Sequence, residues 1–540
     1  MRIAAMNKDR ILILGAGIMQ GPAILTAHEM GLETVVIDAD PDAPMAGKAD
    51  RFEKIDLKDK ENIEIFARTL LSNGGLAGVM TAGTDFSASV AWVAEKLDLP
   101  GISYKTALLA SDKEKMRHCF REAGLPSPNF TTYSEENIKN QHLMETELPF
   151  PFPVVVKPVD NMGSRGCCRV DRATELQEAV QTAMTFSRSG RVIVEEYMEG
   201  PEFSVDAILY QGKVTICGLA DRHIFFPPYF IEMGHTMPTL ASSKDQEALL
   251  DVFIRGIQAL GIDNGAAKGD IKLTARGPMI GEIAARLSGG YMSGWTYPYS
   301  SGANPARGAI CAALGRKPQG LNPTQKWTSA ERAFISIPGI VQSLSGLEEA
   351  RAVPGIKDLF LLAKPGSPVS FPQNNVSKAG NVISAAPGRE EAIQAAEEAA
   401  QKVLIRLICP NADTEAFLAP GSGTAAIPIF PPPAYNADSS LLEQLNHIHP
   451  DTISVAGCIY ELKELNIIPF PAFLQSDLSD YIGRSPKESL ELVRKLSGLA
   501  LPLKTSAGPV LGREFWSALV RGGYQGAVYH IDSLFARKPL

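Results

Sequence analysis

Acidic side chains stand at the ends of several apolar runs in the middle of the chain. Glu195 and Glu196 close the run "RVIVEE", Glu202 follows a short turn later, and Asp270 and Glu282 occupy two strand-like segments joined by the turn "TARGPM". Counted outward from the centre of that turn, Asp270 and Glu282 fall at comparable positions, so both carboxylates can face one point. Two such acids repel each other unless a cation lies between them, and Mg²⁺ prefers one or two carboxylates completed by phosphates and water. The pair therefore predicts a divalent metal site.

A lysine and a glycine-bearing turn supply the complementary charge. Lys157 ends the apolar run "VVVK", where its ammonium group is costly unless an anion meets it, and phosphate is the commonest such anion. The segment "NMGSRG" follows, and its Gly163, Ser164, Arg165 and Gly166 can close over phosphates and offer them backbone N–H groups. Taken alone, this stretch is better explained as an ordinary hairpin turn with a snorkelling lysine. Together with the carboxylate pair, it indicates a site for ATP and Mg²⁺.

Strands and hairpins must position these side chains. "FPVVVKPVDNMGSRGCCRV" predicts a strand, a turn and a return strand, and "RVIVEEYMEGPEFSVDAILYQGKVTICGLADRH" predicts three strand-like runs. "GAAKGDIKLTARGPMIGEIAARLSGG" predicts a hairpin. Before them, the Ser-Asp start and the helical pattern of "ALLASDKEKMRHCFREAGLPSPNF" predict a helix that runs to Gly124.

The first part of the chain, residues 1–105, alternates strand and helix patterns. "RILILGAG", "ETVVIDAD" and "LAGVMTAG" read as strands, and "GPAILTAHEMG" reads as a helix, which predicts a parallel sheet with helices on both faces. Gly15, Gly17 and Gly21, with Asp38 at the end of the second strand, imitate a dinucleotide-binding fingerprint, but their spacing is GxGxxxG. The alternative is that these glycines only let the strand turn tightly into the helix.

Composition limits the partners and the compartment. The 540 residues include 52 basic and 60 acidic side chains, a formal net charge of −8, with no long basic run. This balance argues against nucleic acid or an anionic membrane surface as the main partner. The seven cysteines are scattered without a CxxC pair, and neither a transmembrane segment nor a signal peptide is evident, which predicts a reduced, cytoplasmic protein.

Four motifs, taken in order, resemble the ATP-grasp superfamily: "SDKEKMRHCFREAGLPSP", "VVVKPVDNMGSRGCCRV", "VIVEEYMEGPEFSVDAIL" and "GDIKLTARGPMIGEIAARLSGG". The segment "PGIVQSLSGLEEARAVPGIKDLFLLAKPGSPV" is similar to the lobe that follows the grasp fold in biotin-carboxylase-like and amino-acid-ligase-like members. The resemblance covers about residues 1–409 and implies an α/β fold.

The predicted domains follow from this resemblance and from composition. They are a parallel-sheet preATP-grasp domain (1–105), an ATP-grasp α+β domain (106–325) with a lid at about 126–205, an α+β C-terminal lobe (326–409), a linker rich in Pro, Ala and Ser (410–439) and an additional C-terminal α/β domain of unknown role (440–540).

The resemblance also implies a role for each matching residue around ATP. It assigns the phosphates to two lysines and the closing loop: Lys113, Lys157, Gly163, Ser164, Arg165 and Gly166. Glu195 would accept the adenine amino group, the backbone of Glu196 and Met198 would lie beside it, and Glu202 would hold the ribose hydroxyls. The alternatives are that Lys113 is a solvated helix lysine and that Glu196 is a surface acid.

ATP-grasp enzymes transfer the γ-phosphoryl group to a carboxylate, and an amine or another nucleophile such as a thiol then attacks the acyl phosphate, with release of ADP and phosphate. Such catalysis consists mainly of positioning and charge neutralisation. The resemblance implies that Asp270 and Glu282 bind Mg²⁺, or Mn²⁺ in its place. Lys157 and Arg286 would be the catalytic cations, with Arg286 on the acyl phosphate or on the carboxylate of the acceptor. The alternative for Arg286 is a structural ion pair with Glu282.

One position narrows the substrate. Bicarbonate-using members carry Asn two residues after the second metal acid, where this chain has Ala284, so "EIAARLSGG" is more similar to the amino-acid ligases. Small carboxylate and amine substrates and a homodimer are the expectation. Further candidate substrate contacts are Thr84, Ser87, His235, Ser288, Gly289 and Gly290. His235 is equally consistent with a satisfied core residue. The competing hypotheses are a purine- or carbamoyl-type ligase and a non-catalytic ATP-binding sensor.

Overall fold

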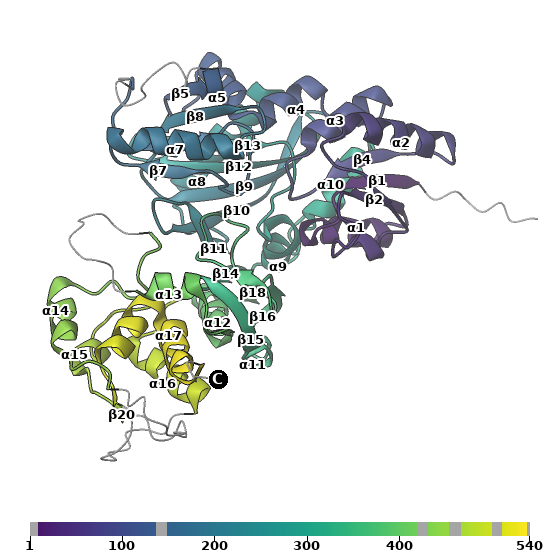
Figure 1. Ribbon diagram of the computed structural model, residues 1–540. Helices are drawn as coiled ribbons and strands as arrows, with labels where there is room; N and C mark the ends of the chain where they lie inside the picture. Colours follow the sequence, from purple (N-terminus) through teal and green to yellow (C-terminus); the bar gives the residue numbers. More distant parts are fainter. Residues whose placement is uncertain (1–8, 137–147, 420–429, 453–465, 499–509, 537–540) are drawn as a thin grey trace, which may run out of the picture. The chain divides into compact units, whose positions relative to one another are not determined.

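The structure is a computed structural model of the chain, and it describes residues 9–136, 148–419, 430–452, 466–498 and 510–536. The chain forms two compact units, residues 1–331 with 385–393 and residues 332–384 with 394–540 (Figure 1). Every residue predicted for catalysis or ligand binding lies in the first unit.

A parallel sheet comes first in the chain, in the strand order β3-β2-β1-β4. Its strands and helices are β1 (Arg10–Leu14), α1 (Gly21–Glu29), β2 (Glu33–Asp38), β3 (Arg51–Lys54), α2 (Lys60–Ser72), β4 (Gly78–Thr81) and α3 (Ser87–Lys96). Successive residues of β1 enter two different cores, since Ile11 and Ile13 belong to one apolar cluster and Leu12 and Leu14 to another. Burial on both faces explains the unbroken apolar run and confirms the predicted parallel sheet.

Asp38 closes the turn after the first strand. Its carboxylate accepts the backbone N–H groups of Ala16 at 2.8 Å and of Asp40 at 3.0 Å. Gly15 adopts a left-handed φ of 103° and donates its N–H to Ile37. Because the carboxylate is committed to its own backbone, the tight-turn interpretation of these glycines is favoured over the dinucleotide fingerprint.

An antiparallel sheet carries the predicted metal acids. Five neighbouring strands of the first unit run in the order β13-β12-β9-β10-β11. They and the helices beside them are α4 (Tyr104–Ser111), α5 (Lys113–Glu122), β9 (Glu202–Tyr210), β10 (Lys213–Phe225), β11 (Ile231–Met237), α8 (Ser243–Leu260), β12 (Gly265–Thr274) and β13 (Gly277–Ala284). Phe120 of α5 and Phe253 of α8 pack with Ile271 and Ile280 of the hairpin in one core. These helices therefore cover one face. On the opposite face, α10 (Pro305–Ala313) packs on Ile208 and Ala266, and the site lies beside it at Asp270.

The lid sheet holds the predicted phosphate lysine. Its strands are β5 (Phe130–Ser134), β6 (Val154–Pro158), β7 (Cys168–Val170) and β8 (Arg191–Glu196), in the order β5-β8-β6-β7. Helix α7 (Ala173–Phe186) buries Leu176 and Val180 against Val154 and Val156 of β6. Lys157 alternates with these buried residues and so faces away from α7, toward the pocket that it lines.

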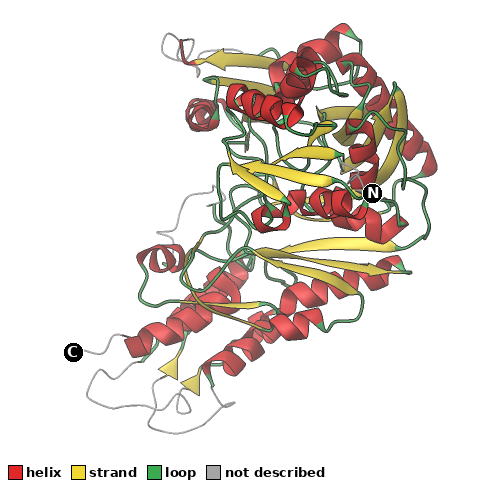
Figure 2. Cartoon of the chain, turned by 90° about the vertical axis from the view of Figure 1, so that its right-hand side faces the viewer, coloured by secondary structure: helices red, strands yellow, loops and turns green. Residues whose placement is uncertain are grey.

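The second unit joins a small α/β lobe to a largely helical segment (Figure 2). Strand β15 (Gly339–Ser345) pairs antiparallel with β17 (Pro368–Val369) and β19 (Leu404–Leu407), and β16 (Ile356–Leu361) pairs with β18 (Gly380–Ala386). The helices of the lobe and of the described residues after it are α11 (Leu347–Arg351), α12 (Arg389–Lys402), α13 (Ala412–Leu418), α14 (Ser439–His447), α15 (Pro471–Leu474), α16 (Pro486–Ser497) and α17 (Arg513–Ala536). Of the described residues, none belongs to a helix long and apolar enough to cross a membrane.

Part of the predicted linker, residues 410–439, is packed. Phe417 of α13 is buried, and Tyr435 lies in the apolar core formed around Trp516. Residues 420–429 of the linker and the apolar stretch at 453–460 lie outside the described residues. The Pro- and Ala-rich composition predicted a linker. Composition alone does not show that single apolar residues such as Phe417 pack into the fold.

Candidate active site

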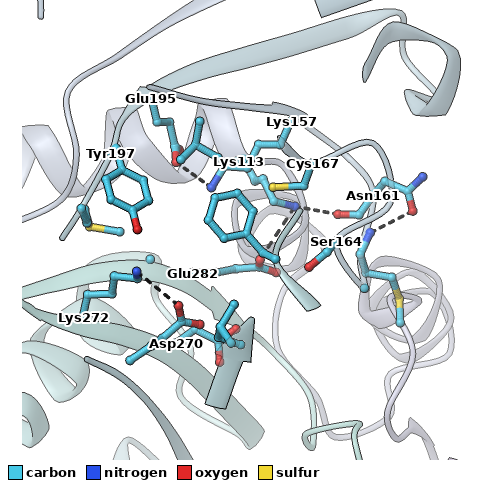
Figure 3. A pocket seen from close by; sticks show the side chains of 18 of the residues that line it. Lys113, Lys157, Asn161, Ser164, Cys167, Glu195, Tyr197, Asp270, Lys272 and Glu282 are labelled. Atoms are coloured by element: carbon cyan, nitrogen blue, oxygen red, sulfur yellow. Dashed lines mark hydrogen bonds and ion pairs between the residues drawn. The ribbon is translucent and has the colours of Figure 1, made fainter. Parts of the chain in front are cut away.

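One pocket in the first unit gathers the residues predicted for nucleotide and metal (Figure 3). It encloses about 910 Å³, including space open to solvent, and it lies between the lid sheet and strands β10, β12 and β13. All predicted ATP and metal residues except Gly166 line it: Lys113, Lys157, Gly163, Ser164, Arg165, Glu195, Glu196, Met198, Glu202, Asp270 and Glu282. The lysines, the glycine-bearing loop and the paired carboxylates of this lining are the groups that a nucleotide bound with a divalent cation requires.

The two predicted metal acids stand directly opposite each other. Asp270 and Glu282 are cross-strand partners in the β12–β13 ladder, and a bulge follows Asp270. Burial would raise the pKa of Glu282, but the surrounding cations, with Lys113 the strongest among them, lower it to about 2. The Nζ atom of Lys113 lies 3.8 Å from the Glu282 carboxylate. Two carboxylates on neighbouring strands are the hard oxygen donors that Mg²⁺ requires, so this donor set fits the cation.

Glu195 is a buried counter-ion for two cations. Its carboxylate accepts from Arg117 Nε at 2.8 Å and lies 2.6 Å from Lys157 Nζ. Burial would raise the pKa of Glu195, but Arg117 and Lys157 lower it. Because each of its oxygens already meets a cationic side chain, the predicted contact between this carboxylate and adenine would have to displace one of them. The geometry favours Glu195 as the residue that orients Lys157.

The loop after β6 has the backbone shape of an anion cradle. Gly163, Ser164 and Gly166 adopt left-handed φ angles of 66°, 59° and 68°. Lys113 holds the loop in place, because its Nζ atom donates a hydrogen bond of 2.7 Å to the carbonyl of Asn161. Burial and the neighbouring Arg188 both lower the pKa of Arg165, so positive charge accumulates at this loop. Such turns present N–H groups to phosphate oxygens.

The residues predicted to contact the sugar and adenine join the two sheets. Glu202 pairs with Arg222 and lies 3.8 Å from Lys272. Glu196 is ion-paired with Arg276 at 2.6 Å, at the rim of the sheet, which supports a structural role for its side chain. Met198 lines the pocket between them.

Arg286 connects the site to the first domain. Its Nε atom lies 3.2 Å from Asp85 Oδ1, and it contributes to the low pKa of Glu282. The backbone N–H of Gly83 donates to the carbonyl of Leu287 at 3.2 Å, so the predicted loop "AGTDFS" does lie beside the end of the hairpin. The ion pair of Arg286 is therefore with Asp85, a partner that sequence spacing did not indicate.

The remaining substrate candidates are partly committed to the protein itself. Ser288 donates to the buried Asp206, and Ser87 is buried with its hydroxyl 3.3 Å from that of Ser111. Thr84 lies in the loop beside Arg286, and Gly289 approaches Gly83 so closely that an added Cβ would lie 3.3 Å from the Gly83 carbonyl oxygen. The Ser288 hydroxyl is thus committed to Asp206, and Ser288, Gly289 and Gly290 are not among the residues that line the pocket of Figure 3.

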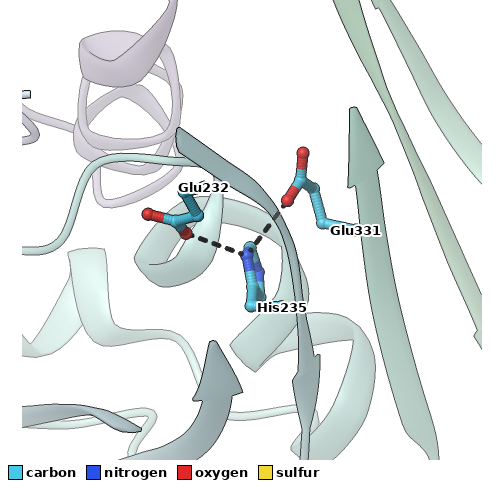
Figure 4. A group of neighbouring side chains, drawn as sticks. All are labelled: Glu232, His235 and Glu331. Atoms are coloured by element: carbon cyan, nitrogen blue, oxygen red, sulfur yellow. Dashed lines mark ion pairs between the residues drawn. The ribbon is translucent and has the colours of Figure 1, made fainter. Parts of the chain in front are cut away.

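His235 is buried, as the core interpretation predicts. Its Nε2 atom lies 2.8 Å from the Thr296 hydroxyl, and its Nδ1 atom lies 3.3 Å from Glu331 and 3.6 Å from Glu232 (Figure 4). Burial would lower the pKa of His235, but the two carboxylates raise it above the ordinary value. The two acids therefore favour the protonated form of the ring.

Four cations at or beside the pocket were missed in the sequence. Arg222 and Lys272 line it, and Arg117 and Lys268 pair with the lining residues Glu195 and Asp270. A signal was present for two of them, because Lys268 and Lys272 flank Asp270 at every second position of one strand and so share its face. Lys268 Nζ lies 2.5 Å from the Asp270 carboxylate. It also stands across the ladder from Ala284, the position where the bicarbonate-using enzymes carry Asn.

Two family models match the chain. The one described as "ATP-grasp domain" matches residues 150–294, and the one described as "L-amino acid ligase C-terminal domain 2" matches residues 333–407. Residues 150–294 are thus an ATP-grasp domain. This match spans β6, the loop after it and the Asp270–Glu282 hairpin, so it contains the central elements of the site.

Curated relatives and a solved structure are similar to parts of this chain. Carnosine synthase 1 of Gallus gallus is 24% identical over 412 residues, 71% of this chain and 44% of the synthase. A D-alanine--D-alanine ligase of Pseudomonas putida is 29% identical over 181 residues, 31% of this chain and 53% of that ligase. The chain thus spans about half the length of each of these two relatives. The crystal structure of an L-amino acid ligase from Bacillus licheniformis has a TM-score of 0.64 at 22% identity, covering 74% of this chain and 99% of that one, and shows the shared fold.

Proposed function

We propose that this protein is an ATP-grasp ligase that joins the carboxylate of a small amino-acid-like substrate to an amine and releases ADP and phosphate. The observation that carries the proposal is the pairing of Asp270 with Glu282 in a pocket that also holds Lys113 and Lys157. These groups supply the charge complement that ATP with Mg²⁺ requires. A thiol in place of the amine would use the same arrangement.

Different pocket residues would contact different parts of the nucleotide. Lys113, Lys157 and the loop backbone would meet the phosphates, Glu202 the ribose hydroxyls and the backbone beside Met198 the adenine. Glu195 holds Lys157 in place through the 2.6 Å ion pair. Mg²⁺, or Mn²⁺, would be held by Asp270 and Glu282, and when bound it supplies neutralisation of the phosphate charge.

The reaction proceeds in two displacements. First, an oxygen of the substrate carboxylate bonds to the γ-phosphorus as the bond to the β–γ bridging oxygen breaks, which gives an acyl phosphate and ADP. Second, the amine nitrogen attacks the acyl carbon, the carbon–oxygen bond to phosphate breaks, and the nitrogen loses a proton as the amide forms. Arg286, held by Asp85, would neutralise charge on the acyl phosphate or on the acceptor carboxylate.

Two observations favour an amino-acid-like substrate. Ala284 provides no amide oxygen beside the metal acids, and Lys268, its cross-strand neighbour on β12, places an ammonium against Asp270 of the same strand. The matched C-terminal model is described as that of an L-amino acid ligase, and the solved neighbour with a TM-score of 0.64 carries the same name. The backbone of Gly289 and Gly290 would receive a substrate carboxylate.

The full-length protein with ATP and Mg²⁺ is expected to release ADP only when an amino-acid carboxylate and an amine acceptor are both present. A coupled ADP assay over pairs of amino acids measures this, with each partner omitted in turn as the control. Bicarbonate with ammonia, and a phosphoribosylamine with glycine, extend the panel to carbamoyl- and purine-type ligation. Tight nucleotide binding without turnover on any pair would indicate a sensor and contradict the proposal.

A further inference from the structure

Arg222 is a buried cation that contacts three acids at once. In β10, its Nη2 atom lies 2.5 Å from Glu232 Oε2, its Nη1 atom lies 3.1 Å from Asp270 Oδ2, and Nη1 also donates to Glu202. Burial would lower the pKa of Arg222, but the acids, with Asp270 the strongest, raise it well above the ordinary value. Arg222 also lines the pocket. A permanent positive charge therefore stands against one of the proposed metal acids.

A second row of charges fixes Arg222 from the neighbouring strand. Glu232, which accepts from Arg222, lies 3.6 Å from His235 Nδ1, and His235 lies 3.3 Å from Glu331 (Figure 4). A row of ionisable side chains thus runs from Glu331 through His235 and Glu232 to Arg222 and Asp270. Glu232, His235 and Glu331 have the composition of a metal site. However, Arg222 already pairs with Glu232, so the row serves as an anchor for the guanidinium.

Asp270 is consequently shared between the protein's own cations and any metal ion. Its Oδ2 atom meets Arg222 and, at 2.5 Å, Lys268, while Oδ1 accepts from Ser204 at 3.2 Å. A divalent cation that binds this carboxylate must displace or share these contacts. The free-energy cost of displacing Arg222 from Asp270 falls when the phosphates of a nucleotide enter the pocket, because the guanidinium can then pair with a phosphate instead.

We propose that Arg222 is a positioning residue that competes with the divalent cation for Asp270, so that metal binding becomes dependent on the nucleotide. The inference rests on the proposed function, since it takes Asp270 as a metal ligand. Glu232 keeps the guanidinium at the pocket wall when Asp270 turns to the metal. The free enzyme would then bind the metal ion weakly, and metal and nucleotide would bind cooperatively.

The test is Mn²⁺ binding to the full-length protein, measured by the electron paramagnetic resonance signal of free Mn²⁺, with and without a non-hydrolysable ATP analogue. Arg222→Met is expected to tighten nucleotide-free Mn²⁺ binding about tenfold or more and to reduce the gain in affinity that the analogue produces. Arg389→Met is the matched control, because Arg389 pairs at 2.5 Å with Asp221, the residue before Arg222 on β10. It should leave Mn²⁺ binding unchanged.

Unchanged or weaker nucleotide-free Mn²⁺ binding by folded Arg222→Met protein would overturn the inference. If circular dichroism shows that this variant does not fold, Arg222→Lys takes its place, because a lysine keeps one charge but cannot reach three acids. Arg222→Lys should tighten nucleotide-free Mn²⁺ binding about threefold. An affinity equal to that of the wild type would again overturn the inference. Asp270→Asn separates the two proposals. If Asp270→Asn still binds Mn²⁺ in the presence of the analogue, the assignment of Asp270 as a metal ligand is refuted. If Asp270→Asn loses Mn²⁺ binding while Arg222→Met behaves like the wild type, only the competition is refuted.

Discussion

Glu282→Gln is expected to lower amino-acid-stimulated ADP release about a thousandfold or more. The carboxylate of Glu282, with its pKa held at about 2, is charged at every pH of interest, and a glutamine amide cannot replace that charge on Mg²⁺. The measurement is the single-turnover rate of ADP formation at saturating ATP, Mg²⁺ and amino acids. Circular dichroism establishes that the compared proteins are equally folded.

Asp221→Asn provides the matched control for this substitution. Asp221 is also an acid on a strand of the same sheet and is also ion-paired, with Arg389, but it does not line the pocket. Its loss should leave the single-turnover rate within about twofold, because Asp221 lies outside the pocket and makes no contact with the transferred group. A Glu282→Gln protein with a rate close to wild type would remove Glu282 from the metal site.

Arg286→Met is expected to lower kcat/KM about a hundredfold to a thousandfold, the range found for loss of one transition-state donor. The reason is that Arg286, whose side chain is 5% exposed, pairs with Asp85 and lies near enough to Glu282 to lower the pKa of that metal acid. Initial rates of ADP release as a function of the acceptor concentration separate its two candidate roles. A rise in KM alone would indicate the grip on the acceptor carboxylate, and a fall in kcat would indicate stabilisation of the acyl phosphate.

Asp85→Asn refines the same prediction. It keeps the guanidinium but weakens its orientation, so a loss of about tenfold in kcat/KM is expected, as for other residues that orient a functional group. If Arg286→Met and Asp85→Asn both retained wild-type kcat/KM, the Arg286–Asp85 pair would be structural only.

Local sequence patterns were sufficient to predict the sheets and the facing positions of the two acids on the hairpin. The βαβ alternation of the first domain and the apolar run of β1 depend on neighbours in sequence, and the fold contains the expected parallel sheet. Asp270 and Glu282 could be placed opposite each other because a tight turn fixes the register of the two strands it joins.

The partners of the site residues could not be predicted in the same way. Arg117 meets Glu195 across 78 positions, and Arg286 meets Asp85 across 201, so each pair depends on how separate elements pack. The sequence suggested a solvated Lys113 as one alternative, yet its ammonium is held by the loop carbonyl of Asn161. Arg222 escaped notice because its three acids come from β9, β11 and β12, and only the assembled sheet brings them together.

The central claim is that the substrate carboxylate itself is phosphorylated, and oxygen transfer tests it most directly. With an amino-acid substrate labelled with ¹⁸O in its carboxylate, the oxygen that bonds to the γ-phosphorus must leave with phosphate when the amine attacks. The account predicts one ¹⁸O atom in each phosphate released during ligation, detected by mass spectrometry or by the ³¹P isotope shift. Label recovered in AMP, or phosphate free of label while the amide product forms, would contradict it.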